Sequence, residues 1–484
     1  MSTGKAQSPA QDAFLRYTEA RKRHWDAIAV RKDSWRSRGE PYHRRLEAVY
    51  RHIVSPNLRV LEIGCGTGEL LAALEPSFGM GVDFSSEMIE RAKRRHPHLH
   101  FLCADAHALP IEETFDVIVL SDLVNDLWDV QAVLENLARL SHPRTRVVIN
   151  TYSLLWEIPL AAVRMLGLAT PVLRQNWLTV HDLTNMLNLA GFEVIRRFQE
   201  VLWPFEEHGP LARFLNRVLV KVKPFSHLAL TNVIVARPKG RPMEAEPVVS
   251  VVVPARNEAG NIEAIFERVP EMGAGTQIVF VEGNSTDDTY AAIERAIEAH
   301  PERRAVLFRQ KGKGKGDAVR LGFEKASGDV LMILDADLTV PPEDLPRFYE
   351  AVRSGEGEFI NGVRLVYPME KQAMRYLNMV GNKFFSLAFT WLLGQPIKDT
   401  LCGTKVLTRS DYARIAANRN YFGDFDPFGD FDLLFGAAKQ NLKIVEIPVR
   451  YRERTYGTTN IDRWRHGLLL LRMTLFAMRR IKFF

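Results

Sequence analysis

Cysteine is scarce in this chain, and its three cysteines lie far apart. Cys65, Cys103 and Cys402 are an odd number and form neither a Cys-x-x-Cys pair nor a cluster with histidine. The sequence therefore indicates neither a disulfide framework nor a structural zinc site. This usage is typical of a reducing compartment, so we expect a cytoplasmic protein.

Long uncharged apolar runs are also missing. No stretch reaches the roughly 20 apolar residues that a membrane-spanning helix needs, and the first residues lack the apolar core of a signal peptide. We therefore do not expect an integral membrane protein of the usual kind. Residues 154–173 are apolar but interrupted by Glu157, Pro159 and Arg164, and we expect them to cap a pocket or to pack internally.

Positive charge, by contrast, is in excess. The 64 lysines and arginines outnumber the 58 acidic residues and give a net charge of +6, which favours acidic partners such as nucleotides, phosphates or an anionic membrane. Residues 461–484 interleave Arg and Lys with Leu, Met and Phe, as in a basic amphipathic helix that lies in a membrane interface. Peripheral contact with the cytoplasmic face of a membrane is one expectation, and a core-packed helix with a basic outer face is the other.

A seam divides the chain. Residues 238–247, PKGRPMEAEP, contain three prolines and four charged residues, which is typical of a linker. We predict one domain over 1–237, with a basic helical lead-in at 1–54, and a second over 248–484. Apolar strands alternate with amphipathic helical patterns on both sides, so we expect a mostly parallel α/β sheet in each domain.

The first domain contains a glycine-rich turn after an apolar strand. The strand at 59–63 runs directly into Gly64, Gly66 and Gly68, and a helical pattern follows. Glycines at this place allow a tight turn and let a ligand approach the backbone at a helix N-terminus. The next strand ends at Asp83, where doubly wound folds present an acid to ribose hydroxyls. Two further strands end at Asp105-Ala106 and at Ser121-Asp122.

These four strand ends resemble the class I S-adenosylmethionine-dependent methyltransferases over about residues 40–237. The resemblance implies a Rossmann-like fold with S-adenosylmethionine as cofactor, and it assigns parts of the cofactor to individual residues. The glycines would lie against its methionine part, the acids and Phe84 would hold ribose and adenine, and Glu62 would face its amino end. The implied cofactor residues are Glu62, Gly64, Gly66, Gly68, Asp83, Phe84, Asp105 and Ala106. A dinucleotide dehydrogenase fits less well, because its third glycine should come later.

Methyl transfer to a hydroxyl also requires a base. The candidates in this domain are His181, Asp122, Asp126 and Tyr152, and none belongs to a motif. The methyl acceptor cannot be inferred from the sequence.

In the second domain, polar segments follow four predicted strands, at 256–258, 282–287, 313–317 and 335–337. We expect them to meet at the carboxyl edge of one sheet, where open α/β sheets bind ligands. Asp335 and Asp337 could simply lie at a solvated strand end, but a solvated end would not require the other three segments to converge there. The convergence instead favours a Mg²⁺ or Mn²⁺ site whose remaining ligands are substrate phosphates. The ion would neutralise a departing diphosphate.

The glycines between Lys311, Lys313 and Lys315 suit a nucleotide diphosphate. The run is too short, and too poor in aromatics, for nucleic acid. We therefore expect no nucleic-acid partner.

As a set, the segments VVPARNEAGNI, VEGNSTDDT, DAD, DTLCGTKVLTR and YRERTYGTTNI resemble the family 2 glycosyltransferases of GT-A fold over about residues 248–460. The resemblance is closest to the dolichol- and polyprenyl-phosphate sugar transferases. It implies a UDP- or GDP-linked sugar donor, a lipid-phosphate or glycan acceptor, and a metal on Asp335 and Asp337. The implied donor-binding residues are Pro254, Ala255, Arg256, Glu258, Glu282, Lys315, Asp335, Asp337, Arg364, Arg375 and Arg454.

This sequence also departs from the family pattern. Glu282, Gly283 and Asn284 occupy the positions of the family's Asp-Asp-Gly. Thr339 occupies a position where the phosphate-sugar enzymes often have a metal-binding Gln, and Asn460 replaces the usual Lys. These departures leave the sugar and the acceptor open.

Inverting transfer to a hydroxyl would require a carboxylate base, and Asp430 or Asp432 lies at a predicted helix start. Asp430 could instead be only the helix N-cap. A lipid phosphate is already ionised and would require no base. We expect a bifunctional enzyme whose two sites serve one glycan or glycolipid pathway. The alternative is an active glycosyltransferase whose methyltransferase-like domain only binds or acts as a scaffold.

Overall fold

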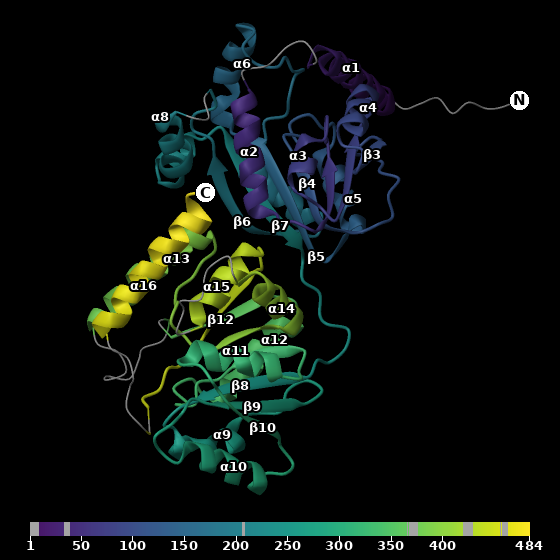
Figure 1. Cartoon of the computed structure of the whole chain (residues 1–484). Helices are drawn as coiled ribbons and strands as arrows, with labels where there is room; N and C mark the ends of the chain where they lie inside the picture. Colours follow the sequence, from purple (N-terminus) through teal and green to yellow (C-terminus); the bar gives the residue numbers. More distant parts are fainter. Residues whose placement is uncertain are drawn as a thin grey trace, which may run out of the picture. The chain divides into compact units, whose positions relative to one another are not determined.

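The computed structural model describes residues 9–32, 39–205, 209–364, 366, 376–419, 429–454, 456 and 463–484. The chain divides into two compact units, one formed by Met1–Lys239 with Phe483–Phe484 and the other by Gly240–Lys482. Within these described ranges, no helix is both long enough and apolar enough to cross a membrane. Each unit is built around its own seven-stranded sheet (Figure 1).

The sheet of the first unit has the strand order β3-β2-β1-β4-β5-β7-β6. Strands β1 to β5 pair in parallel, while β7 runs antiparallel to both β5 and β6. Buried parallel strands require apolar side chains on both faces, which explains the near-continuous apolar runs. The strands are β1 (Arg59–Ile63), β2 (Phe78–Asp83), β3 (His100–Cys103), β4 (Phe115–Ser121), β5 (Ser141–Tyr152), β6 (Phe192–Glu200) and β7 (Thr231–Pro238).

Helices cover this sheet, and several begin at the polar caps that the sequence supplies. The Ser85 side chain accepts a hydrogen bond from the Met88 backbone, and Asp129 accepts one from Ala132. Such caps satisfy the free N–H groups of a helix start. The helices are α1 (Pro9–Lys32), α2 (Glu40–Ile53), α3 (Glu69–Ala73), α4 (Ser86–Arg95), α5 (Val130–Leu137), α6 (Glu157–Met165), α7 (Val180–Leu189) and α8 (Pro210–Arg213).

The sheet of the second unit has the order β10-β9-β8-β11-β13-β12-β14. Strands β8 to β11 are parallel, and β13 runs antiparallel to β11 and β12. The point where the strand order reverses therefore lies between β8 and β11. The strands are β8 (Val249–Ala255), β9 (Thr276–Glu282), β10 (Arg304–Arg309), β11 (Val330–Ile333), β12 (Phe359–Val363), β13 (Lys405–Thr408) and β14 (Ile444–Pro448).

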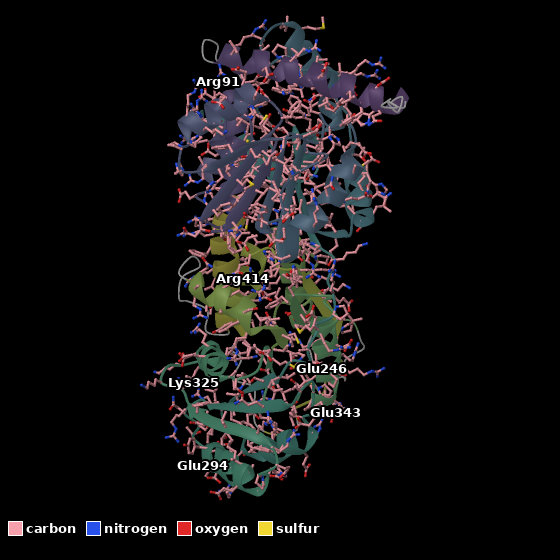
Figure 2. All side chains as sticks on the ribbon, turned by 90° about the vertical axis from the view of Figure 1, so that its right-hand side faces the viewer. Arg91, Glu246, Glu294, Lys325, Glu343 and Arg414 are labelled. Carbon is pink, nitrogen blue, oxygen red and sulfur yellow. The ribbon has the colours of Figure 1, made fainter. Side chains whose placement is uncertain are left out.

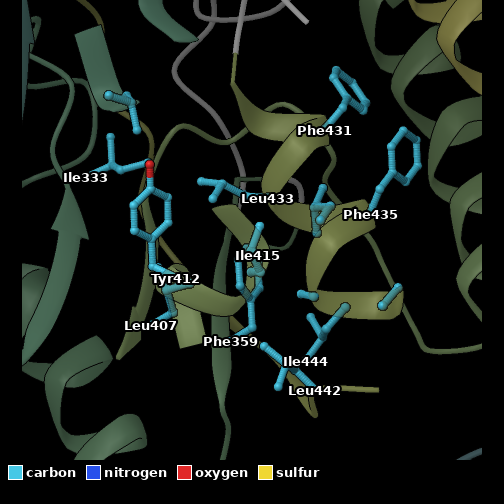
Figure 3. Packing of buried hydrophobic residues seen from close by; sticks show 14 of the residues in the cluster. Ile333, Phe359, Leu407, Tyr412, Ile415, Phe431, Leu433, Phe435, Leu442 and Ile444 are labelled. Atoms are coloured by element: carbon cyan, nitrogen blue, oxygen red, sulfur yellow. The ribbon is translucent and has the colours of Figure 1, made fainter. Parts of the chain in front are cut away.

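One face of this second sheet is covered by helices that contribute aromatic side chains. Tyr412 and Ile415 of α14, Phe431 and Phe435 of α15 and Phe359 of β12 belong to one buried cluster (Figure 3). The rings of Phe431 and Phe435 both contact Phe389. The charged side chains of Glu294, Lys325 and Glu343 point away from the sheet at the boundary of the unit (Figure 2). The helices are α9 (Ile262–Arg268), α10 (Thr289–Ala299), α11 (Lys315–Lys325), α12 (Leu345–Arg353), α13 (Tyr376–Leu393), α14 (Arg409–Ala417), α15 (Asp430–Lys439) and α16 (Arg463–Ala477).

Candidate active sites

A cavity of about 330 Å³ opens at the carboxyl ends of β1, β2 and β4 in the first unit. This is the edge where open α/β sheets bind their ligands, at the point where the strand order reverses. Glu62 and Gly68 do not line it. Six of the expected cofactor residues do: Gly64, Gly66, Asp83, Phe84, Asp105 and Ala106.

The glycine turn is held in place by Asp83. The φ values of Gly64, Gly66 and Gly68 are 75°, 52° and 84°. Residues other than glycine adopt such positive φ values only with strain. The Gly66 N–H donates to Asp83 Oδ2 and the Ser85 N–H donates to Asp83 Oδ1, both at 2.9 Å. A Cβ on Gly66 would meet no described atom within 4 Å, so this backbone faces open space. The turn is therefore a cradle with room for a ligand.

Glu62 contributes a buried acceptor beside this turn. Its side chain is buried, and Oε2 has no hydrogen-bond partner within the described part of the chain. Burial, with the nearby charge of Glu69, raises the pKa of Glu62 well above its usual value. A buried acceptor without a partner is costly, and a cationic ammonium group would satisfy it. The cradle of Gly66 and Asp83 fits a nucleoside, and Glu62, behind the cavity lining, offers an acceptor that suits a cationic group.

Asp122 lies at the end of β4, where a buried hydrogen-bond network meets the cavity. Its φ of 52° is unusual for a non-glycine residue. Asp122 Oδ1 accepts from Tyr42 Oη at 2.8 Å and from Asn150 Nδ2 at 2.6 Å, and Tyr50 Oη donates to Asn150 at 2.7 Å. Burial raises the pKa of Asp122 to about 6, although these hydrogen bonds oppose the shift. Such a carboxylate can accept a proton near neutral pH.

The other candidate bases have different surroundings. Asp126 lines the cavity but pairs with Arg21 at 3.1 Å and accepts from Trp25 Nε1 at 2.7 Å, so it ties α1 to the site. Tyr152 also lines the cavity, and burial raises its pKa well above the usual value. His181 is exposed on α7 and does not line the cavity.

In the second unit, loops that follow β8, β10, β11 and β14 meet at one edge of the sheet. Lys315 Nζ lies 2.5 Å from Asp335 Oδ1. The guanidinium of Arg454 bridges two acids, at 2.7 Å from Asp337 Oδ2 and 3.0 Å from Glu258 Oε1. The segments that contain Glu258, Lys315 and Arg454 therefore meet at the segment that contains Asp335 and Asp337.

Asp335 and Asp337 can serve as oxygen ligands of a hard cation. The described ranges contain no cluster of three or more His, Cys, Asp or Glu side chains that could hold a metal ion. Mg²⁺ usually takes only one or two carboxylates and fills its other positions with phosphate oxygens and water. Two carboxylates that face Lys315 and Arg454 fit a metal that arrives together with a nucleotide diphosphate.

Glu258 follows β8 and Glu282 ends β9, at the same edge of the sheet. Burial raises the pKa of Glu258 to about 7, against the opposing charge of Arg454. Glu282 is buried at the end of β9, where it accepts from the Ser285 N–H and lies 3.2 Å from Arg309 Nε. Of their expected neighbours, Ala255 is buried in β8 and Arg256 is exposed after it.

Arg364 and Arg375 were both expected to bind the sugar-nucleotide donor, and the structure describes only Arg364. Arg364 forms a bidentate pair with the buried Asp399, at 2.7 and 2.8 Å. Asp399 lies in the DTLCGTKVLTR segment, and no sequence pattern predicted that this carboxylate would pair with Arg364. Arg375 lies outside the described residues.

The two candidate bases of α15 have separate environments. Asp430 Oδ1 lies 3.0 Å from Lys405 Nζ, whereas Asp432 Oδ2 lies 3.0 Å from Arg419 Nε. Burial alone would lower the pKa of Lys315, but Asp335 and Asp430 raise it. Gly429 lies against Gly316, so Asp430 lies near Lys315 at this edge of the sheet. The N-cap of α15 is Gly429, so the interpretation of Asp430 as an N-cap is wrong.

The chain combines a Rossmann-like class I methyltransferase fold in its first unit with a GT-A fold in its second. Residues 250–415 match the family model described as "Glycosyl transferase family 2", and residues 23–197 match "Methyltransferase domain". The chain belongs to glycosyl transferase family 2, and its first unit is a methyltransferase-like domain.

Individual relatives match one unit each. A dolichol-phosphate mannosyltransferase from Pyrococcus furiosus is 39% identical over 109 residues, 22% of this chain and 30% of the relative. The glycosyltransferase AglJ from Haloferax volcanii is 30% identical over 46% of this chain and 70% of the relative. A solved S-adenosylmethionine-dependent methyltransferase from Mesorhizobium loti is 19% identical, with 41% of this chain and 98% of that chain covered and a TM-score of 0.30. The chain thus spans less than a third of the Pyrococcus protein's length.

Proposed function

We propose that this chain is bifunctional. Its second unit would transfer a sugar with inversion, in a metal-dependent reaction, from a UDP- or GDP-linked donor to a lipid phosphate. Its first unit would methylate a hydroxyl of a glycan or glycolipid from the same pathway, with S-adenosylmethionine as the methyl donor. The observation that carries the proposal is that Lys315 pairs with Asp335, while Arg454 bridges Asp337 and Glu258. We propose that the enzyme acts at the cytoplasmic face of a membrane, where a nucleotide-sugar donor can meet a lipid acceptor.

In the second unit, Asp335 and Asp337 are the residues that would hold a divalent metal. When bound, the ion neutralises charge on the departing diphosphate. Lys315 and Arg454 add positive charge at the same edge, and Thr339 donates to Asp337 Oδ1 from its N–H and its hydroxyl. These contacts fix the carboxylate before substrate arrives, so little reorganisation is required during transfer.

In the first unit, Gly66 and Asp83 would cradle the cofactor, and Glu62 would accept from its ammonium group. When bound, the cofactor supplies an electrophilic methyl group. Asp122 would take the proton that the acceptor hydroxyl loses, because its carboxylate reaches the cavity and has a pKa of about 6. Tyr42 and Asn150 hold this carboxylate in one orientation.

A lipid phosphate is the acceptor that the relatives favour. The Pyrococcus relative is named for dolichol phosphate, and a Mycolicibacterium smegmatis relative is named polyprenol monophosphomannose synthase. A phosphate monoester is already ionised and requires no base. Asp430 can therefore remain paired with Lys405 throughout the reaction.

The test is mass spectrometry of the products formed by the purified chain. The reaction contains Mn²⁺, a panel of UDP- and GDP-sugars and a short polyprenyl phosphate, with or without S-adenosylmethionine. We expect a glycosylated lipid phosphate that gains one methyl group only when S-adenosylmethionine is present. Sugar-nucleotide turnover without a lipid product would point instead to a hydroxyl acceptor.

The scaffold alternative is tested in the same preparation. If the first unit is a scaffold, calorimetry detects no affinity for S-adenosylmethionine and no methylated product forms.

A further inference from the structure

Helix α6 and the short turn before it, η2 (Leu154–Trp156), expose a row of apolar side chains. Ile158 is 81% exposed and Met165 is 89% exposed, while Leu154, Leu155 and Leu166 are also exposed. Large apolar side chains are usually scattered singly on a protein surface, and a contiguous group marks an interaction site. The only charged residues in α6 are Glu157 and Arg164.

The opposite side of the same segment faces the cavity. Trp156, Leu160 and Val163 line it, together with Tyr42 and Tyr152 from the buried network. Apart from Arg164, which also lines the cavity, and the exposed Glu157, the helix is apolar both toward the cavity and toward solvent. A helix that only closes a core has a polar outer face, so this outer side is built for another contact.

A second segment adds exposed apolar residues and positive charge. Helix α8 continues through η3 (Phe214–Val218), η4 (Leu219–Lys221) and η5 (Phe225–Leu228). No acidic residue occurs between positions 209 and 228. The exposed cations are Arg213, Arg217 and Lys223, and the exposed apolar residues are Leu211, Phe214, Val222, Phe225 and Leu228.

Direct contacts join the two segments. Trp156 Nε1 donates to the Leu228 carbonyl at 2.9 Å. Asn216 of η3 donates to the Trp203 carbonyl at 2.7 Å, and the adjacent Phe205 lines the cavity while remaining half exposed. We call the exposed parts of 154–166, 203–205 and 211–228 the apolar rim. It borders the cavity of the first unit.

We infer that the apolar rim is a docking surface for an anionic lipid bilayer. Exposed Leu, Ile, Met, Trp and Phe side chains beside Arg and Lys, with no acidic residue between 209 and 228, match the composition of segments that lie in a membrane interface. Anionic lipids would attract Arg213, Arg217 and Lys223. A second copy of the chain would bring the same cations face to face, which disfavours a symmetric dimer. The inference does not depend on which sugar or methyl acceptor the enzyme uses.

A fluorophore attached to α6 tests this contact directly. The exposed Cys103 is first replaced by Ser, and an environment-sensitive dye is attached through Ile158→Cys. The matched control places the dye through Leu189→Cys, on α7 of the same unit, where the side chain is 75% exposed. The probe is a phosphatidylcholine vesicle with or without phosphatidylglycerol, in the absence of donor and cofactor.

We expect a blue shift and an intensity gain at position 158, stronger with phosphatidylglycerol, and no change at position 189. Vesicle binding without a response at position 158 would place the contact elsewhere and overturn the inference. No vesicle binding at all would overturn it too. Neither result depends on turnover. The product assay tests the proposed function separately, so a failure of the membrane contact and a failure of the proposed function can be told apart.

Unlabelled variants provide a second test by vesicle sedimentation. We expect the double substitution Phe214→Ser with Phe225→Ser to weaken binding about tenfold or more, while Leu189→Ser leaves it unchanged. Cofactor calorimetry checks that the first unit is folded. A concentration-dependent dimer that the double variant abolishes, without vesicle binding, would show that the rim binds a second copy and would overturn the inference.

Discussion

Asp122 combines a left-handed backbone with a carboxylate that three buried polar residues surround. Because its pKa is raised to about 6 and a base acts when deprotonated, we expect methyl transfer to increase with pH through about 6 and then level off. Asp122→Asn should lower the rate by about 10²- to 10⁴-fold and remove this pH dependence. A pH–rate profile with saturating cofactor checks this.

The control for this variant is cofactor affinity, which calorimetry should find within about threefold of wild type, since Asp122 would act on the acceptor and not on the cofactor. A variant that kept the ionisation near pH 6 would show that another group is the base.

Asp337 and Asp432 offer a matched pair in the second unit. Both are ion-paired to an arginine, but Asp337 lies at the donor edge and Asp432 pairs with Arg419. We expect Asp337→Asn to lower sugar transfer by about 100-fold or more, because it removes a metal ligand and a partner of Arg454. Asp432→Asn should retain activity and lower only the melting temperature. Loss of activity in Asp432→Asn with intact donor binding would make Asp432 the base.

Most of the site residues that the sequence predicted belong to motifs. The glycine turn, Asp83 and Asp105 could be placed because their spacing follows strand ends. Asn150, Tyr50 and Tyr42 escaped notice because they come from β5 and α2 without any local motif. The same holds for Asp399, whose pairing with Arg364 depends on a contact across 35 positions of the chain. Such contacts are tertiary, and only the folded chain reveals them.

At the scale of elements, α11 packs on β8 through a glycine. A Cβ at Gly322 would clash with Val252 Cγ1, whereas a Cβ at Gly381 in α13 would meet no described atom within 4 Å. Gly322→Ala should therefore destabilise the second unit by about 1–3 kcal/mol. Gly381→Ala should be neutral or stabilise it by up to about 1 kcal/mol. Urea denaturation measures the free energy of unfolding of both variants. Equal changes in the two variants would show that the close contact between Gly322 and Val252 does not determine the effect of the added methyl group.

The alternation of strands and helices was readable because buried parallel strands need apolar runs and amphipathic helices need a 3.6-residue period. Two features escaped this logic. The antiparallel position of β13 between β11 and β12 depends on chain connectivity. The outward exposure of apolar side chains on α6 was not predicted, because the apolar run at 154–173 indicated a segment that caps a pocket or packs internally.

At the scale of the whole molecule, each proposed site draws its residues from one unit. Substitutions at sites that share no partner are usually additive. We expect Asp83→Ala to abolish methylation and leave sugar transfer within about twofold. Asp337→Asn should lower sugar transfer and leave methylation within about twofold when the glycosylated lipid phosphate is supplied as the methyl acceptor. Product analysis of both variants and of the double variant checks this. A loss of sugar transfer in Asp83→Ala would show that the two activities are coupled.

The orphaned oxygen of Glu62 has a consequence for the heat of ligand binding. Its raised pKa means that this carboxyl holds a proton more tightly than an exposed one, and an ammonium group brought to it favours the ionised form. Binding would therefore release a proton into the buffer. The apparent enthalpy should then differ between Tris and phosphate by the difference in their ionisation heats, and Glu62→Gln should remove that difference. The first unit would thus report occupancy of its cavity as an exchange of protons with the solution.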